Sequence, residues 1–372
     1  MSSAGLHTGA RRAYTEARRP IDSGRLGAAL LRRLPANVAH KVAVKALRYG
    51  LLPSRPRPDD RILASRLWGI DFTNPVGMAA GFDKDAEAVD GLLGLGFGFA
   101  EAGTVTPQPQ PGNRQPNLFR LEQDRALVNR LGFPSRGLAA FAANLARRAR
   151  PAGVVGANIG INTGTADPVR DIVTGVRTLA PLADYLVINV SCPNTPGLCE
   201  WQAADRLAEI AGAARAARDA PDGSRRPPLL VKIAPDLSDT GLAAVAEVAL
   251  SAGIDGLIAS NTTVARPAAL RSARAAEAGG LSGPPLFAAS TETLSQLYRL
   301  TGGRLPLVGC GGVASGADAY AKIRAGASLV QLYTALVYGG PGLVGEITRS
   351  LAAHLRADGF ERLSDAVGAD HR

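Results

Sequence analysis

From about residue 70 onward, eight short and almost entirely apolar runs alternate with alanine-rich segments. Runs that are apolar throughout, rather than at every second position, are typical of parallel strands buried on both faces. The segments between them have the composition of helices that cross from one strand to the next. Eight such units in about 300 residues favour a closed (β/α)8 TIM barrel over an open doubly wound sheet. The runs are Pro75–Ala80, Phe97–Ala102, Val154–Ile159, Tyr185–Val190, Leu229–Ile233, Gly256–Ala259, Leu305–Gly309 and Ser328–Leu332.

Composition excludes several other classes of protein. Hydrophobic residues make up 46% and charged residues 20% of the 372 residues, which is ordinary globular usage rather than that of a disordered chain. No apolar run reaches the roughly eighteen residues needed to span a bilayer. Three cysteines cannot form a disulfide framework and no hydrophobic signal sequence precedes the fold, so we expect an intracellular protein. Four scattered histidines and the absence of a CxxC motif predict no metal site.

The positive charge is confined to the N-terminal part of the chain. The net charge is +10, and residues 1–66 alone contain fourteen basic and only four acidic residues, so the remainder is balanced. Such a segment can face anionic lipid or nucleic acid, or it can be a solubilising tail. We expect residues 1–20 to be a disordered basic tail.

Residues 21–50 have the pattern of two short amphipathic helices. Leucines recur at every fourth position in the first, Pro35 suits the first turn of the second, and Gly50 suits its end. The apolar positions are Leu26, Leu30 and Leu34 in the first, and Val38, Val42, Ala46 and Leu47 in the second. Such helices can cap the main domain or enter a lipid headgroup layer. We therefore expect a helical extension and linker over 21–60, the barrel over 61–360 and a C-terminal tail over 361–372.

Two lysines stand at strand ends in a chain that otherwise prefers arginine. Only five of the 42 basic residues are lysines: Lys41, Lys45, Lys84, Lys232 and Lys322. The active site of a barrel lies at the C-terminal ends of its strands, where Lys84 and Lys232 are expected. A lysine inside an apolar strand is costly to bury without an anionic partner. We interpret Lys84 and Lys232 as ligands for anionic groups, although Lys232 could instead pair with Asp236.

Glycines after the seventh strand and the residues after the eighth resemble the usual phosphate site of a barrel. Gly311 and Gly312 precede a helix start, and Tyr333 and Thr334 end the eighth run. Backbone N–H groups left free at such positions bind phosphate. A phosphorylated ligand is therefore predicted, although the same glycines could serve close packing.

Amides and one cysteine complete the candidate chemistry. Amides that donate and accept suit a planar ring with alternating C=O and N–H groups, although any one of them can simply cap a turn. Cys192 follows a buried strand among polar residues and is the candidate nucleophile or base, whereas Cys199 and Cys310 are expected to be structural. The asparagines at or beside strand ends are Asn129, Asn158, Asn189, Asn194 and Asn261.

Taken together, these segments closely resemble the dihydroorotate dehydrogenase family over residues 35–350. The matching strings are Ala79–Asp85, Gly103–Pro107, Asn129–Phe133, Asn189–Gly197, Val231–Leu237 and Gly280–Gly283. The pattern from Pro35 to Ala39-His40 resembles the extension of the membrane-associated, quinone-using class 2 members. The resemblance implies an FMN enzyme of pyrimidine biosynthesis that oxidises (S)-dihydroorotate to orotate and reduces a membrane quinone. It also implies a peripheral protein on the cytoplasmic side of the cell membrane, held to an anionic membrane surface by its extension, with no nucleic-acid partner.

The matched motifs imply a set of site residues. Lys84 would pair with the substrate carboxylate, Lys232 would offset negative charge on reduced flavin, and Cys192 would remove the C5 proton. Arg120 matches a position near the path from flavin to quinone. Substrate contacts are expected from Lys84, Asn129, Arg130, Leu131, Gly132, Phe133, Asn189, Asn194, Asn261 and Thr262. FMN contacts are expected from Ala80, Gly81, Phe82, Asp83, Lys84, Thr104, Asn158, Asn189, Lys232, Ser260, Gly283, Gly312, Tyr333 and Thr334.

The chain departs from the family pattern at a few positions. Cys192 stands where the quinone-linked class has serine and the soluble class has cysteine. Ile161 replaces a usual lysine, Cys199 a usual arginine and Ser260 a usual threonine. Three alternatives follow: a soluble-type member with another electron acceptor, a different FMN barrel such as a tRNA dihydrouridine synthase, and a flavin-binding protein without turnover.

Overall fold

Eight parallel strands close into a barrel at the centre of the molecule. The computed structural model describes residues 23–52, 60–148, 153–191, 194, 198–219 and 226–372. The strands follow the order β10-β12-β13-β3-β4-β7-β8-β9 around the barrel. They are β3 (Val76–Met78), β4 (Phe99–Val105), β7 (Val154–Ile159), β8 (Tyr185–Asn189), β9 (Leu229–Ile233), β10 (Gly256–Ala259), β12 (Leu307–Cys310) and β13 (Ala327–Leu332). Each predicted run overlaps one of these strands, so the predicted TIM barrel is confirmed.

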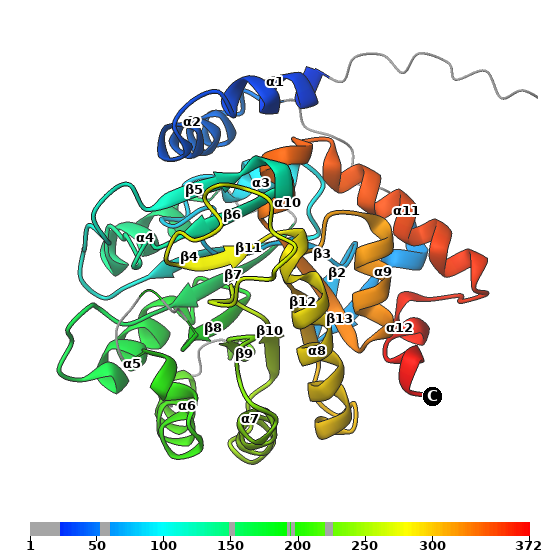
Figure 1. The fold of residues 1–372 in the computed structure, drawn as a ribbon. Helices are drawn as coiled ribbons and strands as arrows, with labels where there is room; N and C mark the ends of the chain where they lie inside the picture. Colours follow the sequence, from blue (N-terminus) through cyan, green and yellow to red (C-terminus); the bar gives the residue numbers. More distant parts are fainter. Residues whose placement is uncertain (1–22, 53–59, 149–152, 192–193, 195–197, 220–225) are drawn as a thin grey trace, which may run out of the picture.

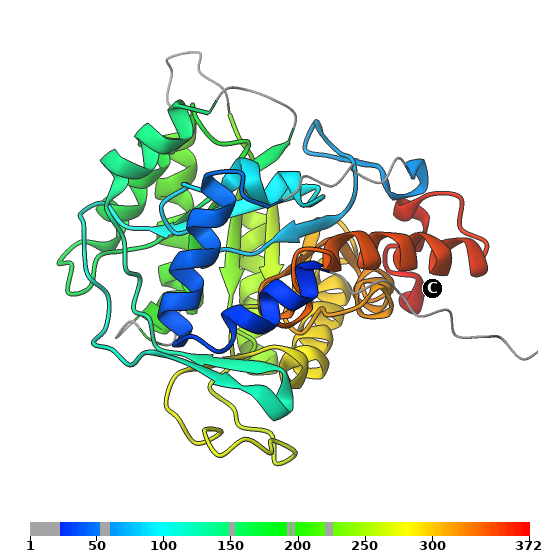
Figure 2. The ribbon, with the colours of Figure 1, turned by 90° about the horizontal axis from the view of Figure 1, so that it is seen from above.

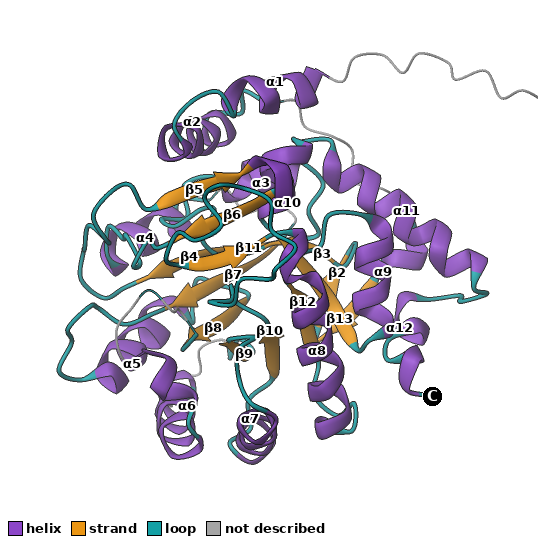
Figure 3. Ribbon diagram, in the orientation of Figure 1, coloured by secondary structure: helices purple, strands orange, loops and turns teal. Residues whose placement is uncertain are grey.

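Helices surround the barrel on its outer side (Figure 3). Each of them buries apolar residues against the barrel, and α5, α7 and α9 also begin with a side-chain cap. In α5, for example, the Asp167 side chain accepts a hydrogen bond from the Arg170 amide, Pro168 opens the first turn, and Ile172 and Val176 are buried. The surrounding helices are α3 (Val89–Gly94), α4 (Leu138–Ala146), α5 (Pro168–Leu179), α6 (Ala204–Arg218), α7 (Asp239–Ser251), α8 (Phe287–Thr301), α9 (Gly316–Arg324), α10 (Thr334–Gly339) and α11 (Leu343–Ala357).

Five further strands lie outside the barrel, and none of them was predicted. The hairpin of β1 (Ser65–Leu67) and β2 (Ile70–Phe72) packs on the barrel core, where the Phe72 ring meets Phe99 edge-on at 5.6 Å. The other three form an antiparallel sheet in the order β11-β6-β5. They are β5 (Leu118–Leu121), β6 (Ala126–Asn129) and β11 (Gly280–Ser282). This sheet lies between the barrel and the N-terminal extension (Figure 1).

The N-terminal extension consists of two helices above the mouth of the barrel, as the sequence predicts. These are α1 (Ser23–Leu31) and α2 (Ala36–Arg48). Helix α1 packs against α10, and α2 packs against α3 and β5. Seen from above, both helices cross the barrel opening (Figure 2). The Arg120 guanidinium of β5 holds them in place by donating to the carbonyls of Arg32 and Leu34 in the connecting turn.

The apolar residues expected on α2 divide between two faces of the helix. Val38 and Val42 are 46% and 41% exposed, whereas Leu47 is buried and Ala39 and Ala43 face inward. The side chains of α2 that pack on the protein are therefore mostly alanines, together with Leu47 and Val44. Leu26, Leu30, Val38 and Val42, by contrast, are exposed, which leaves them free to contact something other than the barrel.

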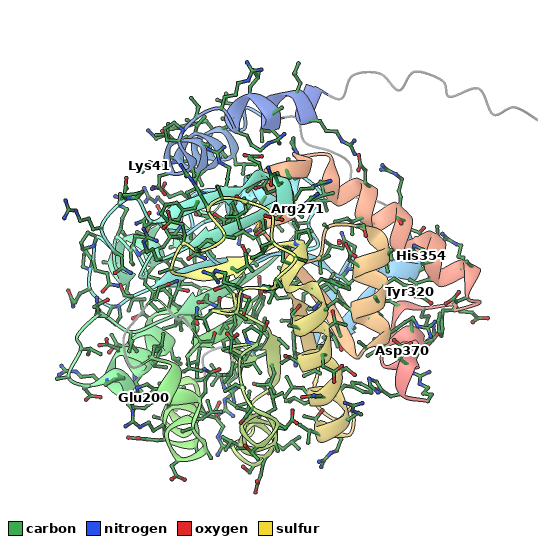
Figure 4. The ribbon with its side chains drawn as sticks, in the orientation of Figure 1. Lys41, Glu200, Arg271, Tyr320, His354 and Asp370 are labelled. Carbon is green, nitrogen blue, oxygen red and sulfur yellow. The ribbon has the colours of Figure 1, made fainter. Side chains whose placement is uncertain are left out.

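The C-terminal residues 361–372 are folded onto the barrel rather than extended away from it. Leu363 and Ala366 in α12 (Leu363–Ala366) are fully buried. Asp370 in the 3-10 turn η5 (Ala369–His371) pairs with Arg324 of α9 at 2.7 Å. Figure 4 shows Asp370 near the C-terminus, with Tyr320 and His354 above it, whose rings stack at 5.4 Å.

Across the described ranges, no helix has the length and apolar character needed to cross a membrane.

Candidate functional site

A cavity opens at the C-terminal ends of the barrel strands, and we call it the barrel-mouth cavity. The β3, β8, β9, β10, β12 and β13 ends contribute to it, and the β5–β6–β11 sheet forms a further wall. Chain segments far apart in sequence therefore converge on one space. Besides the predicted residues given below, its walls include Ala79, Leu118, Leu127, Pro134, Ser282, Pro284, Leu286, Cys310, Gly311, Val313, Ala314, Leu332 and Ala335.

The two strand-end lysines both line the barrel-mouth cavity. Lys84 donates to the carbonyl of Gly81 at 2.6 Å, and its burial lowers its pKa to about 8. Lys232 lies on β9 and is only 4% exposed. No carboxylate of the described residues pairs with its ammonium; Asp236, the alternative partner, instead bonds Thr263 and Val264. A buried ammonium of this kind favours an anionic group inside the cavity.

A chain of buried polar side chains leads from the barrel core to the cavity. At its core end Asn158 donates to Glu101 Oε1 at 2.7 Å, and it accepts from the Thr104 hydroxyl at 2.6 Å. Asn189 then donates to Thr104 Oγ1 at 3.0 Å. The opposite oxygen of Glu101 accepts from Gln331 at 2.6 Å. These bonds fix the amide of Asn189 at the cavity wall because each side chain is held by its neighbour.

Further amides on the other side of the cavity are also fixed. Asn261 donates to the Ser191 hydroxyl at 3.0 Å, and Ser191 donates to Asn189 Oδ1 at 3.1 Å. Asn194 donates to the backbone carbonyl of Asn129 at 3.1 Å. The cavity therefore presents several oriented amides, which suits a planar ring that carries both C=O and N–H groups.

Gly311 and Gly312 form a close-packed turn directly after β12, beside the end of β13. A Cβ on Gly312 would lie 2.5 Å from Phe287 Cβ, and one on Gly311 would lie 2.8 Å from the Ser290 hydroxyl. Both residues have positive φ, which glycine adopts without strain. Opposite this turn, the Ser282 and Thr334 hydroxyls lie 2.8 Å apart at the start of α10. The backbone amides of such a turn and the two hydroxyls are groups that can bind a phosphate.

Most predicted site residues line this one cavity. Of the predicted substrate contacts, those on the wall are Lys84, Asn129, Leu131, Gly132, Phe133, Asn189, Asn194, Asn261 and Thr262. Of the predicted cofactor contacts, those on the wall are Ala80, Gly81, Lys84, Thr104, Asn189, Lys232, Ser260, Gly283, Gly312, Tyr333 and Thr334.

Four predicted contacts do not line the cavity. Arg130 turns outward, where it pairs with Glu277 at 2.9 Å and stacks over Phe119. Phe82 faces the space beneath the extension, and the Asp83 carboxylate accepts hydrogen bonds from the amides of Glu87 and Ala88. Asn158 lies behind the cavity wall. Its side-chain oxygen accepts hydrogen bonds from Thr104 and Asn189, which line the cavity.

Cys192, the predicted base, lies outside the described residues. Its neighbour Ser191 is fully buried and bonded to Asn189 and Asn261. Ile161 is buried in the core. Cys310, which the sequence predicts to be structural, lines the cavity and is therefore a site residue that we missed. Its position at the end of β12, directly before two glycines, was the available signal.

A second, mostly apolar cavity lies between the extension and the barrel, and we call it the extension groove. It is adjacent to the barrel-mouth cavity because Leu118, Leu127 and Tyr333 line both. Arg120, which the motif match expects near the path from flavin to quinone, lies on its wall. Its other lining residues include Ala28, Leu31, Ala36, Ala39, His40, Ala43, Leu47, Leu52, Phe82, Leu95, Leu336, Val337 and Pro341.

His40 of α2 occupies the junction of the two cavities. Its Nδ1 lies 3.4 Å from the Tyr333 hydroxyl and its Nε2 lies 3.4 Å from Lys84 Nζ. Burial, together with the charges of Lys84 and Lys41, holds the pKa of His40 well below its usual value. Its imidazole is therefore neutral at neutral pH.

Within the described part of the chain, no group of His, Cys, Asp and Glu is arranged to hold a metal ion.

A closed (β/α)8 barrel with a cavity at the C-terminal ends of its strands, lined by a buried lysine and oriented amides, is the architecture of a TIM-barrel enzyme. The profile of the dihydroorotate dehydrogenase family matches residues 62–355. The chain belongs to the dihydroorotate dehydrogenase family, whose members use a flavin, and to its quinone-dependent class 2. The family and class predicted from the sequence are thus confirmed.

The similarity extends over nearly the whole chain. The dihydroorotate dehydrogenase (quinone) of Azorhizobium caulinodans is 60% identical, covering 90% of this chain and 95% of the relative. The Rhodospirillum rubrum enzyme of the same name is 56% identical over 94% and 95%. The mitochondrial enzyme of Mus musculus is 50% identical over 92% and 89%. The solved structure of the Eimeria tenella enzyme with ferulenol has a TM-score of 0.87 at 42% identity, covering 90% of this chain and 96% of that chain.

Proposed function

We propose that this chain oxidises (S)-dihydroorotate to orotate in pyrimidine biosynthesis, with FMN in the barrel-mouth cavity and a membrane quinone in the extension groove. When bound, FMN supplies a two-electron acceptor for the hydride at C6 of the substrate and a donor for the quinone. The observation that carries the proposal is that Lys84, Lys232 and the amides of Asn129, Asn189, Asn194 and Asn261 line one cavity.

The residues of the cavity fit FMN at both of its ends. The turn at Gly311 and Gly312, with Thr334 opposite, suits the phosphate. The buried ammonium of Lys232 offsets the negative charge that a flavin ring gains on reduction. The Glu101–Asn158–Thr104 chain keeps the wall beside the ring in one arrangement.

Dihydroorotate is held by charge at one end and by amides along its ring. The ammonium of Lys84 pairs with the substrate carboxylate. Asn129, Asn194 and Asn261 bond the ring C=O and N–H groups, because their side chains reach the same cavity. Cys192 takes the C5 proton as its thiolate while the hydride leaves C6, so the substrate loses one proton and one hydride to become orotate.

The extension groove suits a quinone because apolar side chains surround it and His40 and Arg120 provide polar contacts.

The outer face of the extension suits a membrane surface. Its exposed large aliphatic side chains are Leu26, Leu30, Leu34, Val38 and Val42. Lys41 is exposed on α2, on the same side of the molecule (Figure 4), and its charge attracts anionic lipid. We propose a peripheral protein on the cytoplasmic face of the cell membrane.

Anaerobic stopped-flow spectroscopy of the purified holoenzyme tests the activity. Dihydroorotate is expected to bleach the flavin absorbance, and a ubiquinone analogue is expected to restore it faster than fumarate or NAD does. Lys84→Met is expected to raise the dihydroorotate concentration needed for half-maximal bleaching by at least about tenfold, since a charge-assisted pair is lost. Lys45→Met, on the exposed face of α2, is the matched control. A native protein that dihydroorotate does not bleach would refute the proposal.

A further inference from the structure

Lys322 is a fully buried lysine that the activity described above does not use. It lies on α9 and is 0% exposed. Its stem packs against β12, where a Cβ on Gly309 would lie only 3.0 Å from Lys322 Cδ. Burying an ammonium is costly unless it is compensated, so its retention in an arginine-rich chain needs a physical reason.

The ammonium of Lys322 has few partners inside the protein. It donates to the Ser290 hydroxyl at 2.7 Å and lies 5.2 Å from the centre of the Phe287 ring, both on α8. No carboxylate of the described residues lies within ion-pair distance of it. The titratable groups that act on its charge are Cys310 of β12 and Asp318 of its own helix. One hydroxyl and one aromatic face do not replace the hydration of an ammonium.

The partners of Lys322 are also the residues that support the glycine turn. The Ser290 hydroxyl has one proton, which the carbonyl oxygens of Gly311 at 3.0 Å and of Phe287 at 3.1 Å share as acceptors. Gly312 is packed on Phe287, since a Cβ at Gly312 would lie 2.5 Å from Phe287 Cβ. Lys322 therefore lies one side-chain layer behind the turn, on the side away from the barrel-mouth cavity.

We propose that Lys322 is a positioning residue for the phosphate end of the cofactor. Through Ser290 its ammonium holds the Gly311–Gly312 turn in its binding shape, and it supplies a positive charge directly behind that turn. The inference rests on the proposed FMN site and adds a charge that does not touch the cofactor. It explains the buried ammonium, because an anion on the far side of the turn compensates it.

The proposal has a consequence for pH. Burial lowers the pKa of Lys322 to about 7 in the protein without ligand. A phosphate dianion near the turn favours the protonated ammonium, so FMN binding takes up a proton above that pH. The affinity for FMN is therefore expected to fall as the pH rises from about 7 to 9, where the phosphate itself no longer changes its ionisation.

The test compares FMN with riboflavin, which lacks the phosphate. Apoprotein is titrated with each flavin and the quenching of flavin fluorescence gives the two dissociation constants. For Lys322→Met, which keeps the length of the side chain and removes its charge, the FMN constant is expected to rise by roughly tenfold while the riboflavin constant stays within about twofold. The fall of FMN affinity above pH 7 is expected to become smaller in the same variant, where Lys84, with a pKa of about 8, still titrates in the cavity. Lys45→Met is expected to behave as the native protein in both titrations.

Two further measurements keep the test decisive. Ser290→Ala leaves the lysine in place and removes its link to Gly311, so it is expected to give a smaller loss that is also specific to FMN. Cys310→Ser is expected to retain the pH dependence, which separates the ammonium from the nearby thiol. If Lys322→Met fails to fold, the ratio of the FMN and riboflavin constants in Ser290→Ala still decides.

Equal weakening of both flavins, an unchanged FMN constant in a folded variant, or a native FMN affinity that does not vary between pH 7 and 9 would overturn the inference. A native apoprotein that binds neither flavin would instead refute the proposed function.

Discussion

Lys84 Nζ lies 3.4 Å from His40 Nε2, and this contact joins the cavity at the barrel mouth to the groove under the extension. The two basic groups are close enough that charge on one disfavours charge on the other. Burial and the Lys84 ammonium together hold the pKa of His40 well below its usual value. In our proposal Lys84 pairs with the substrate carboxylate. His40 beside it stays neutral because its pKa is lowered, and it lines the extension groove.

The first prediction concerns this histidine. His40→Leu places an apolar side chain in the groove and removes both ring nitrogens. We therefore expect reoxidation of the reduced enzyme by a ubiquinone analogue to slow by about tenfold. Bleaching by dihydroorotate should stay within about threefold, because the Gly81 carbonyl still holds Lys84. Stopped-flow measurement of the two half-reactions separates them.

His40 is already neutral in the native protein. The pH profile of the rate of quinone reduction should therefore have the same shape near pH 6.5 in the native protein and in His40→Leu. An inflection there that is lost in His40→Leu, or equal slowing of both half-reactions, would contradict the role given to the contact.

The second prediction concerns the extension. Deleting residues 21–50 removes α1, α2 and one wall of the groove, while the glycine turn, Lys232 and the asparagines remain. Quinone reduction should be lost, and flavin bleaching by dihydroorotate should persist. The deletion exposes apolar surface, so the half-reactions should be measured in detergent. Quinone turnover with a normal KM in the deleted protein would show that the groove is not the quinone site.

The third prediction concerns Cys192. A free thiol ionises near pH 8.5, far more readily than a hydroxyl. The rate of bleaching by dihydroorotate should therefore rise with pH at lower pH in the native protein than in Cys192→Ser. The measurement is a stopped-flow pH series on both proteins. Identical profiles would exclude Cys192 as the base.

The barrel could be predicted from the sequence because each of its strands is a buried apolar run. The β5–β6–β11 sheet could not be predicted in the same way. Its strands contain three or four residues each, and β11 is brought beside β6 only by the fold, which pairs Leu281 with Val128. No local pattern records a contact over that separation.

The residues of the candidate site could be predicted where they follow strand ends, because those ends converge. The prediction was wrong where the backbone reverses direction. Gly81 has φ +101 and its amide bonds the Gly103 carbonyl, so the chain turns away from the cavity at this point. Phe82 and Asp83 consequently face away from this cavity and are buried elsewhere, although they lie between residues that line it. The sequence left open whether Val38 and Val42 face the barrel or a lipid layer, because an apolar stripe does not indicate what covers it; in the structure both are exposed.

The fourth prediction concerns Glu101, which is fully buried in the barrel. It accepts from Asn158, Gln331 and Tyr185, at 2.7, 2.6 and 3.2 Å. Glu101→Ala leaves these donors without an acceptor and opens a cavity, so we expect a loss of about 3–5 kcal/mol in the free energy of unfolding. Urea unfolding provides the measurement. Glu292→Ala, on the exposed face of α8, is the control and should change stability by less than about 0.5 kcal/mol. A loss in Glu101→Ala no larger than that of the control would show that the buried carboxylate does not organise this chain of side chains.

The fifth prediction is a pH dependence of stability that arises at Asp83. Burial raises the pKa of this carboxyl to about 6, although the amides of Ala88 and Glu87 donate to it. A pKa raised in the folded state means that the native protein binds the proton more tightly than the unfolded chain does. Its contribution to stability is therefore greatest below about pH 4 and declines as the pH rises to about 6, by at most about 3 kcal/mol.

Asp83→Asn cannot ionise and should lack this decline, although it loses one of the two acceptor contacts. Urea unfolding of native protein and variant at pH 5 and pH 7 measures the difference in slope, and Asp71→Asn on the exposed β2 hairpin should keep the native slope. Asp83 anchors the start of α3, next to the loop that carries Lys84. We therefore expect the affinity for dihydroorotate to decline over the same pH range as the stability. Parallel slopes for native protein and Asp83→Asn would instead mean that the carboxyl is ionised at no cost in the fold.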